Sequence, residues 1–559
     1  MSKIKTGKIM QFEQSIAFYL RRGSARQSEG ALLEAVVMYR KAAALEPNNA
    51  QVLMQLAQTY SDLGCFELSN RVLYSMLWRC SSVSSDFFYN VGCNYIGLRE
   101  FDLALGYFER FASMADASSP QVHEVMSFLE IIESEGAGVL VNETAPDADA
   151  GAYLIANQGM KLIESGREKE ALELLEKART LSPRTPETLY AIATAHMMLG
   201  ELDKARKVCN EALELDEFDV QGNCINVIVC HRLNDPAACE YSINIIKSAQ
   251  DMSPEEEYKV AMTFASIGDE KTAQGYFVCA LRIRPYDRNT LHAAAVNCML
   301  LGEREKAAGY WSTILKIMGE DPIALYYLSL TKDAQYNPKG LNYHYQLPLD
   351  EELRLIQLIN KAFKLPILKL RRDTVLLDIV RWAIEYGNEK LKPGALYVLT
   401  KCAPDKAEAI LRDFIVRPRE SREAKAAAFE QLNHIHAKEP YVSVEEEGIV
   451  EVRVGDVHEG ILPQAYREVA QKIYIALTER KDEECLTQAL AQWERYINGL
   501  NGKYNRIANS DNYAAAVEYI ARSAIGKPLT QNEVCKFYGI PLSGIKNALS
   551  MLNRVLMRK

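Results

Sequence analysis

Apolar positions recur along residues 152–333 with a period of about 34 residues. In each unit a small residue is followed four positions later by an apolar one and seven positions later by another, which is the spacing of one helix face. A turn residue precedes each small residue by five positions. The small column is Ala171, Ala205, Cys239, Ala273 and Ala307, and the turns fall at Gly166, Gly200, Asn234, Gly268 and Gly302. Several columns that keep one period predict five structural repeats in this stretch.

Residues 1–136 keep the same pattern. Their small column is Ala35, Ser69 and Ala104, in which the second interval exceeds the first by a single position. Prolines close three of the units along the chain, at Pro47, Pro183 and Pro285, because proline does not continue a helix. We therefore predict eight repeats, three before and five after a linker at 137–151 that is rich in Gly, Ala and Asp.

These columns resemble the tetratricopeptide repeat, in which small residues let two antiparallel helices, A and B, approach closely. The resemblance implies that the pairs stack into a superhelix, because one pair alone does not bury its apolar stripe. It also implies an inner groove, lined by helix A residues, where a protein or peptide docks. Chaperone-binding members hold a C-terminal carboxylate there with lysines, asparagines and an arginine. Here Met54, Gln58, Ala156 and Met160 stand in the clamp columns and Asn90 fits one, so a chaperone tail is disfavoured.

Beyond the repeats the pattern remains helical but loses its period. Residues 322–333 have the pattern of a helix that covers the last repeat, and 350–437 carry further amphipathic stretches. The run 441–457 alternates apolar and polar residues around Glu447-Gly448, which predicts a β-hairpin. The expected organisation is three repeats at 1–136, the linker 137–151, five repeats with a covering helix at 152–333, a helical region at 350–437, a hairpin at 438–457, a helical connector at 458–510 and a C-terminal domain at 511–559.

The C-terminal domain carries a compact helix, a capped helix, a glycine turn and a last helix. Thr530 and Glu533 have the spacing of a capping box, and Gly539 suits the left-handed position of a sharp turn. This pattern resembles the helix-turn-helix of bacterial regulators and, with the preceding helix, the cyclin-like repeat of general transcription factors. Pro541 and Gly544 depart from it at the start of the last helix, where glycine costs about 1 kcal/mol relative to alanine.

The resemblance implies a DNA-contacting face on the last two helices. Its candidate residues are Lys536, Ser543, Lys546, Asn547, Ser550 and Arg554. Cations neutralise phosphates, and amide and hydroxyl side chains reach base edges, so this face suits a major groove. The alternative is a small helical domain that docks on the chain's own repeats or on a partner.

Charge is distributed unevenly over the 559 residues. The net charge of −9 argues against nucleic-acid binding over the whole surface, but residues 501–559 hold nine Lys and Arg against three Asp and Glu. With 48% hydrophobic and 25% charged residues, no membrane-length apolar run and no signal-peptide core, the composition predicts a soluble, cytoplasmic protein. Twelve dispersed cysteines without a C-x-x-C pair indicate reduced thiols.

Motifs that carry catalysis are absent from the sequence. It has no phosphate-binding loop, no G-x-S-x-G and no H-E-x-x-H, so we expect no enzymatic activity, no cofactor and no metal. The nearest metal-like group is Cys224, Cys230, His231 and Cys239. Because Cys230 and Cys239 occupy apolar or small columns of the repeat, buried thiols are the better interpretation.

The sequence thus predicts an all-α tetratricopeptide solenoid, continued by a helical region with one hairpin and a helix-turn-helix-like domain. Its expected function is that of an interaction scaffold that binds a peptide or protein in the repeat groove. The alternative is a transcription-related regulator, in which the repeats sense a partner and the C-terminal helices bind DNA.

Overall fold

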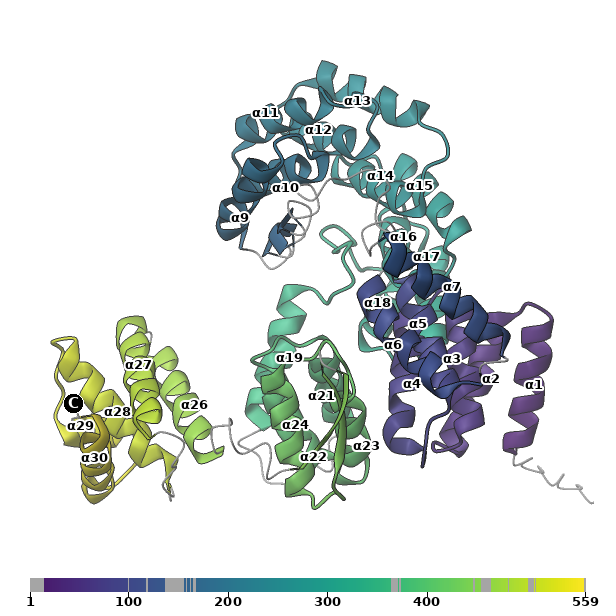
Figure 1. The fold of residues 1–559 in the computed structure, drawn as a ribbon. Coiled ribbons are helices and arrows are strands. Elements are labelled where there is room, and N and C mark those ends of the chain that lie inside the picture. The colour runs from purple at the N-terminus through teal and green to yellow at the C-terminus, as the bar shows by residue number, and fades with distance from the viewer. Residues whose placement is uncertain are drawn as a thin grey trace, which may run out of the picture. The chain divides into compact units, whose positions relative to one another are not determined.

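The computed structural model describes residues 15–98, 100–116, 119–135, 155–156, 158–160, 162–163, 167–362, 370, 374–445, 448–453, 464–480, 482–500, 507 and 509–556. The described chain is all-α apart from one two-stranded sheet, which confirms the expected fold class (Figure 1). It divides into two units, a first unit of 1–424 with 444–448 and a second unit of 425–443 with 449–559. The predicted linker at 137–151 lies outside the described residues.

Helix pairs make up most of the first unit, and successive pairs stack in chain order. The first block comprises α1 (Ile16–Ser28), α2 (Leu32–Leu45), α3 (Ala50–Asp62), α4 (Phe66–Arg79), α5 (Ser85–Gly97), α6 (Phe101–Met114) and α7 (Pro120–Glu135). The second block comprises α9 (Glu168–Leu181), α10 (Pro186–Met198), α11 (Leu202–Leu213), α12 (Val220–Arg232), α13 (Pro236–Ser248), α14 (Pro254–Ser266), α15 (Glu270–Ile283), α16 (Arg288–Leu300), α17 (Arg304–Met318) and the covering helix α18 (Pro322–Thr331). We number the pairs so that α10 and α11 are repeat 5, and α16 and α17 are repeat 8.

Local sequence signals set the ends of these helices. The Asp287 side chain accepts from Thr290 N at 2.7 Å and caps α16, while Ser253 and Glu256 form a capping box at the start of α14. The turn residues adopt left-handed φ angles of 76° at Gly200, 81° at Gly268 and 78° at Gly302, and Gly166 lies outside the described residues. Pro47, Pro183 and Pro285 each lie two residues beyond the last residue of α2, α9 and α15. A proline there cannot extend the helix, because it lacks an N–H.

The small columns are buried where the two helices of a pair meet. Ala35, Ala104, Ala171, Ala205, Ala273 and Ala307 are all fully buried. A second small column lies twelve residues earlier, and a Cβ added to Gly23 would be 2.6 Å from Tyr39 Cε1, well inside contact distance. The same holds at Gly92, where an added Cβ would be 2.5 Å from Phe108 Cε1. The small residue of the first helix therefore makes room for the large residue of the second.

The first block packs back onto later parts of the first unit. Helix α2 contacts α17, and beside this contact Tyr60 OH donates to Ile317 O at 2.8 Å. Helices α19 (Leu349–Ala362), α21 (Thr374–Tyr386), α22 (Lys392–Cys402) and α23 (Pro404–Ile415) follow the repeats, and α4 contacts α23. There Trp78 Nε1 and Arg79 Nη2 donate to the Asp413 carboxylate at 2.9 and 2.8 Å.

An ion network joins the first block to α21. Arg71 donates to both oxygens of Glu385 at 2.7 Å, and Arg417 Nη2 lies 3.0 Å from the same carboxylate. Burial raises the pKa of Glu385, but the two guanidiniums outweigh it and hold the pKa at about 2. The carboxylate is therefore ionised at neutral pH and attracts both arginines.

Helix α24 (Arg422–His434) and the sheet of β1 (Tyr441–Glu445) and β2 (Gly448–Val452) fall where the two units meet in the sequence. The two strands confirm the predicted hairpin. The rest of the second unit comprises α26 (Gln464–Glu479), α27 (Glu483–Gly499), α28 (Ser510–Ala524), α29 (Gln531–Tyr538) and α30 (Leu542–Leu556).

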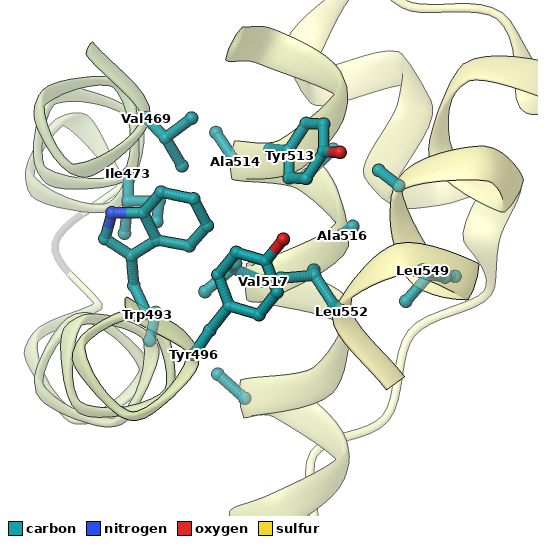
Figure 2. Close-up of a cluster of buried hydrophobic side chains, with 14 of the residues drawn as sticks. Val469, Ile473, Trp493, Tyr496, Tyr513, Ala514, Ala516, Val517, Leu549 and Leu552 are labelled. Carbon is teal, nitrogen blue, oxygen red and sulfur yellow. The ribbon is translucent and has the colours of Figure 1, made fainter. Parts of the chain in front are cut away.

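Helices α26–α30 share one hydrophobic core. Its centre is aromatic, with the ring centroids of Trp493 and Tyr466 5.5 Å apart and those of Trp493 and Tyr496 5.3 Å apart. Figure 2 shows Trp493 and Tyr496 of α27 facing Val469 of α26 and Val517 of α28. Since α28 contacts α26, α27 and α30, the helices of 511–559 are buried together with those of the predicted connector.

Candidate interaction surfaces

One column on the first helices of repeats 5–8 is partly exposed. It comprises Thr194 in α10, Ile228 in α12, Met262 in α14 and Val296 in α16, which hold the same position of successive repeats, and we call it the helix A column. Thr194, Ile228 and Met262 are half-buried although their immediate neighbours in sequence are all buried, whereas Val296 is fully buried. The column thus presents side chains at its first three positions and not at its last.

A segment without helix or strand, residues 332–348, lies against repeats 7 and 8, and we call it the strap. Leu341 and Leu347 are buried. Tyr343 OH donates to Asn297 Oδ1 of α16 at 2.9 Å, and its ring stacks on Phe277 of α15 with centroids 6.2 Å apart. Because its partners come from two successive repeats, Tyr343 lies where repeats 7 and 8 meet.

His292 of α16 binds the main chain of the strap. Trp311 Nε1 donates to His292 Nδ1 at 3.1 Å, and an indole N–H is only a donor, so Nδ1 carries no proton. Nε2 is then protonated and donates to Asn342 O at 3.0 Å. Burial lowers the pKa of His292 to about 4, which keeps the ring neutral at pH 7. The neutral ring therefore donates one hydrogen bond to a main-chain carbonyl of the strap.

The second half of the strap is held at the start of α18. Tyr345 OH donates to Asp321 Oδ1 at 2.5 Å, and Arg288 of α16 lies over the Tyr345 ring at 4.9 Å. Asp321 also accepts from Tyr386 of α21, and it caps α18 by accepting from Ala324 N at 2.8 Å. One carboxylate thus joins the strap, the covering helix and α21.

Further bonds hold the strap by its main chain at both ends. Arg304 of α17 donates to Asp333 O and Tyr336 O, each at 2.7 Å. Tyr327 of α18 donates to Gln346 O at 2.9 Å. The sequence predicts no role for residues 334–349, although three tyrosines between two helices are a signal for a packed segment.

Asn90, the one residue that fits the chaperone clamp, is occupied within its own block. Its Nδ2 donates to Asp86 O at 2.7 Å and lies 3.7 Å from Met54 Sδ. A depression of about 550 Å³ elsewhere, between α2 and α17, has Arg40, Lys41 and Lys316 in its lining. Arg40 Nη1 donates to Lys316 O at 3.2 Å near the end of α17, so one of these cations serves the helix terminus.

The six predicted DNA-contact residues lie on the last two helices. Lys536 is on α29, and Ser543, Lys546, Asn547, Ser550 and Arg554 are on α30, and all six are exposed. Gly539 joins the helices with φ 64°. A Cβ on Gly544 would overlap the Asn512 side chain of α28, so this glycine allows α30 to approach α28 closely.

A buried ion network holds α29 against α28. Glu518 of α28 is fully buried and accepts from Arg480 at 2.7 and 2.5 Å, from Arg522 Nε at 2.8 Å and from Tyr538 OH at 2.8 Å. Burial, followed by the charge of Glu518, raises the pKa of Tyr538 well above its ordinary value. Arg522 is therefore one of the nine cations of 501–559 that serves the interior, where Glu518 of the same segment balances its charge.

The cysteines of the metal-like group are buried thiols. Cys224, Cys230 and Cys239 are all buried, and burial raises the pKa of Cys224 to about 11. No group of three or more His, Cys, Asp or Glu within the described ranges is arranged to hold a metal ion. In the same part of the chain, no helix has the length and apolar content needed to cross a bilayer.

Comparison with known proteins addresses the repeats. The profile of the tetratricopeptide repeat family matches residues 162–221. The chain is 26% identical over 262 residues to the TPR repeat-containing protein YvcD of Bacillus subtilis (strain 168), covering 46% of this chain and 53% of that protein. It is 23% identical over 240 residues to the TPR repeat-containing protein MJ1428 of Methanocaldococcus jannaschii, covering 41% of this chain and 42% of that protein. The chain thus spans about half the length of the curated relatives it matches.

Among solved structures, the thermophilic TPR protein TTC0263 of Thermus thermophilus is similar to 32% of this chain over 97% of its own length, with 19% identity and a TM-score of 0.28. The family profile covers α9–α11. The chain therefore contains tetratricopeptide repeats, as the spacing of its small residues predicts.

Proposed function

We propose that the chain is a protein-interaction scaffold, without catalytic activity, whose second block binds a peptide or protein segment. The observation that carries this proposal is the helix A column. Thr194, Ile228 and Met262 are half-buried at the same position of the first helices of three successive repeats, among buried neighbours. Partly exposed side chains in a line, two of them apolar, suit the side chains of a bound segment.

Peptides selected from a displayed random library on the full-length chain test this proposal. Met262→Glu places a charge in the column, and we expect it to weaken the selected peptides about tenfold or more in fluorescence anisotropy, a loss of about 1.4 kcal/mol. Tyr241→Glu is the matched control, because Tyr241 is 60% exposed on α13, the second helix of its repeat. Selection of no peptide, or equal binding to wild type and Met262→Glu, would reject the proposal.

A second proposed function is DNA binding by the α29–α30 face. It is supported by the exposure of all six predicted residues and by the absence of Asp and Glu after Glu533. If Lys536, Lys546, Arg554 and Lys559 contact phosphates, log affinity falls with log salt at a slope of about −3.6.

The test uses charge reversal in the full chain. A chain ending at Ser510 would lose α28–α30 and open the core that α26 and α27 share with them. We expect Lys536→Glu with Lys546→Glu and Arg554→Glu to abolish binding to a mixed-sequence duplex at low salt. Lys527→Ala is the control. Lys527 lies in the loop before α29, outside the proposed DNA-contacting face, and its Nζ is 2.5 Å from Glu484 of α27. A wild-type chain without DNA affinity leaves the scaffold as the whole function.

A further inference from the structure

We propose that the strap occupies in cis the part of the second block's binding face that belongs to repeats 7 and 8, and that a partner segment of the same chemistry displaces it. That chemistry is an irregular segment with two tyrosines one residue apart, as Tyr343 and Tyr345 are in the strap. The proposal rests on the proposed function, because it assigns the ligand class of the same face.

The first helices of repeats 7 and 8 differ in burial, as expected if the strap covers repeat 8 and leaves the column of repeat 7 partly exposed. In α16 every residue from Thr290 to Met299 is buried, whereas α14 has only four buried residues. Met262 and Val296 hold the same position of the repeat, and only Val296 is fully buried. The first helix that binds the strap, α16, is therefore also the one whose helix A column residue, Val296, is fully buried.

The contacts of the strap are of two kinds: some hold its main chain, which any peptide has, and others hold its tyrosine side chains. His292 and Tyr327 donate to carbonyls of Asn342 and Gln346, which any polypeptide supplies. Tyr343 and Tyr345 instead place hydroxyls on the side-chain oxygens of Asn297 and Asp321. A residue without a hydroxyl at position 343 leaves the buried Asn297 Oδ1 without this donor, which should weaken binding about tenfold. At position 345 it removes one donor from the buried Asp321 carboxylate, which keeps Tyr386 and Ala324 N, so the loss of affinity should be smaller. The tyrosine pair therefore determines which segments bind.

The strap is built so that it can leave. Lys339, Gly340, His344 and Gln346 are exposed, and the two tyrosine rings are only half-buried. A tethered segment competes at an effective concentration of about millimolar, so a free copy of it does not bind the closed chain at micromolar concentration. A partner that also contacts Thr194, Ile228 and Met262 gains affinity that the strap lacks.

The experiment measures binding of a dye-labelled peptide of residues 338–348, PKGLNYHYQLP, to the full-length chain. We expect Tyr343→Ala with Tyr345→Ala in the chain to loosen the strap and to bind the peptide at least about tenfold more tightly than wild type does. A second chain keeps every strap side chain but carries inserted protease sites at the exposed Lys339–Gly340 turn and at the exposed Leu349. Cleavage at both sites removes the tethers of the strap, so it no longer competes at a high effective concentration, and the affinity for the peptide should likewise rise.

Matched peptides complete the test. The Tyr343→Ala peptide should lose binding to both opened chains, and the His344→Ala peptide should bind as the native peptide does. Equal affinity of closed and opened chains, no binding to the cleaved chain, or equal binding of the Tyr343→Ala and native peptides would overturn the proposal. If the strap peptide fails while library peptides still require Met262, the strap proposal falls and the scaffold function stands.

Discussion

The repeats of the first unit and the five helices α26–α30 solve the same packing problem by different means. In the repeats, alanines and glycines at fixed spacing let one helix lie close to the next, and the same contact recurs once in every repeat. In α26–α30 the core is centred on Trp493 and three tyrosines, which pack among aliphatic side chains and alanines, and no spacing repeats (Figure 2). A packing contact that repeats at a fixed spacing can be predicted from the sequence, whereas a core without such a spacing is identified only from the folded structure.

The two regions also differ in how they use charge. Ion pairs between helices of successive repeats, such as Arg206 with Asp235 at 2.7 Å, lie at half-exposed positions. In α26–α30 the carboxylate of Glu518 is fully buried between Arg480 and Arg522. Removing one member of a buried pair is far more costly than removing one at the surface. The C-terminal core therefore depends more on the Glu518 carboxylate than the repeats depend on a half-exposed pair such as Arg206 with Asp235.

The largest expected effect is that of Glu518→Leu. It removes the buried carboxylate from Arg480, which is a quarter exposed, and from Arg522, which keeps Asp482, and should lower the stability of α26–α30 by about 3–5 kcal/mol. Hydrogen exchange followed by mass spectrometry should show faster exchange in α28 and α29 and unchanged exchange in α10–α15. Glu320→Leu is the control, since Glu320 is 82% exposed and pairs with Arg381 at the surface. Protection of α28 that stays at the wild-type level would show that the network contributes little.

Next comes Ala273→Leu in repeat 7. Ala273 is fully buried, so the larger side chain overpacks the pair α14–α15 and should cost about 1–3 kcal/mol. The measurement is the urea midpoint of the repeats, with Ala237→Leu on the exposed side of α13 as control. An unchanged midpoint for Ala273→Leu would mean that the small column does not limit helix approach.

A smaller effect is expected at Glu385, which ties the first block to α21. Its pKa of about 2 is depressed, so its contribution is present above the ordinary carboxyl value and is lost as pH falls toward 2. Because a quarter of the side chain is exposed, we expect Glu385→Gln to cost only about 1–2 kcal/mol at pH 6. Urea unfolding from pH 6 to pH 3 should show the two chains converging as pH falls. A difference that is constant with pH would exclude the ion network as its source.

The smallest effects compare two glycines inside helices. Gly309 of α17 has open space around it, so Gly309→Ala should stabilise the repeats by about 0.5–1 kcal/mol. Gly544→Ala gains the same helix propensity but meets Asn512, so it should give no gain or a loss, and Asn512→Ala should relieve that loss. Thermal unfolding of both single variants and of the double variant checks this. Equal stabilisation by both substitutions would show that the close approach of α30 to α28 does not require a glycine at position 544.

Much of the fold was predictable because its signals are local. The turn glycines and the prolines lie at helix ends and the small column at buried positions of α9–α17, and the covering helix predicted at 322–333 is α18 at Pro322–Thr331. The strap was not predictable, because its partners lie 46 residues away at Asn297 and 50 residues away at His292 and belong to no period. The same limit applies to Trp78 and Asp413, which are 335 residues apart.

Sequence alone was enough to predict the repeat and the polar face of the last helix, since both depend on spacings within one helix or one pair. Which faces remain available depends instead on tertiary packing. On folding, Val296 at the last position of the helix A column becomes buried, and the first block packs against α17 and α23. Arg522 pairs with the buried Glu518. Helix formation and pair packing follow from neighbours in the chain, whereas occupancy of a surface depends on distant residues that only folding brings together.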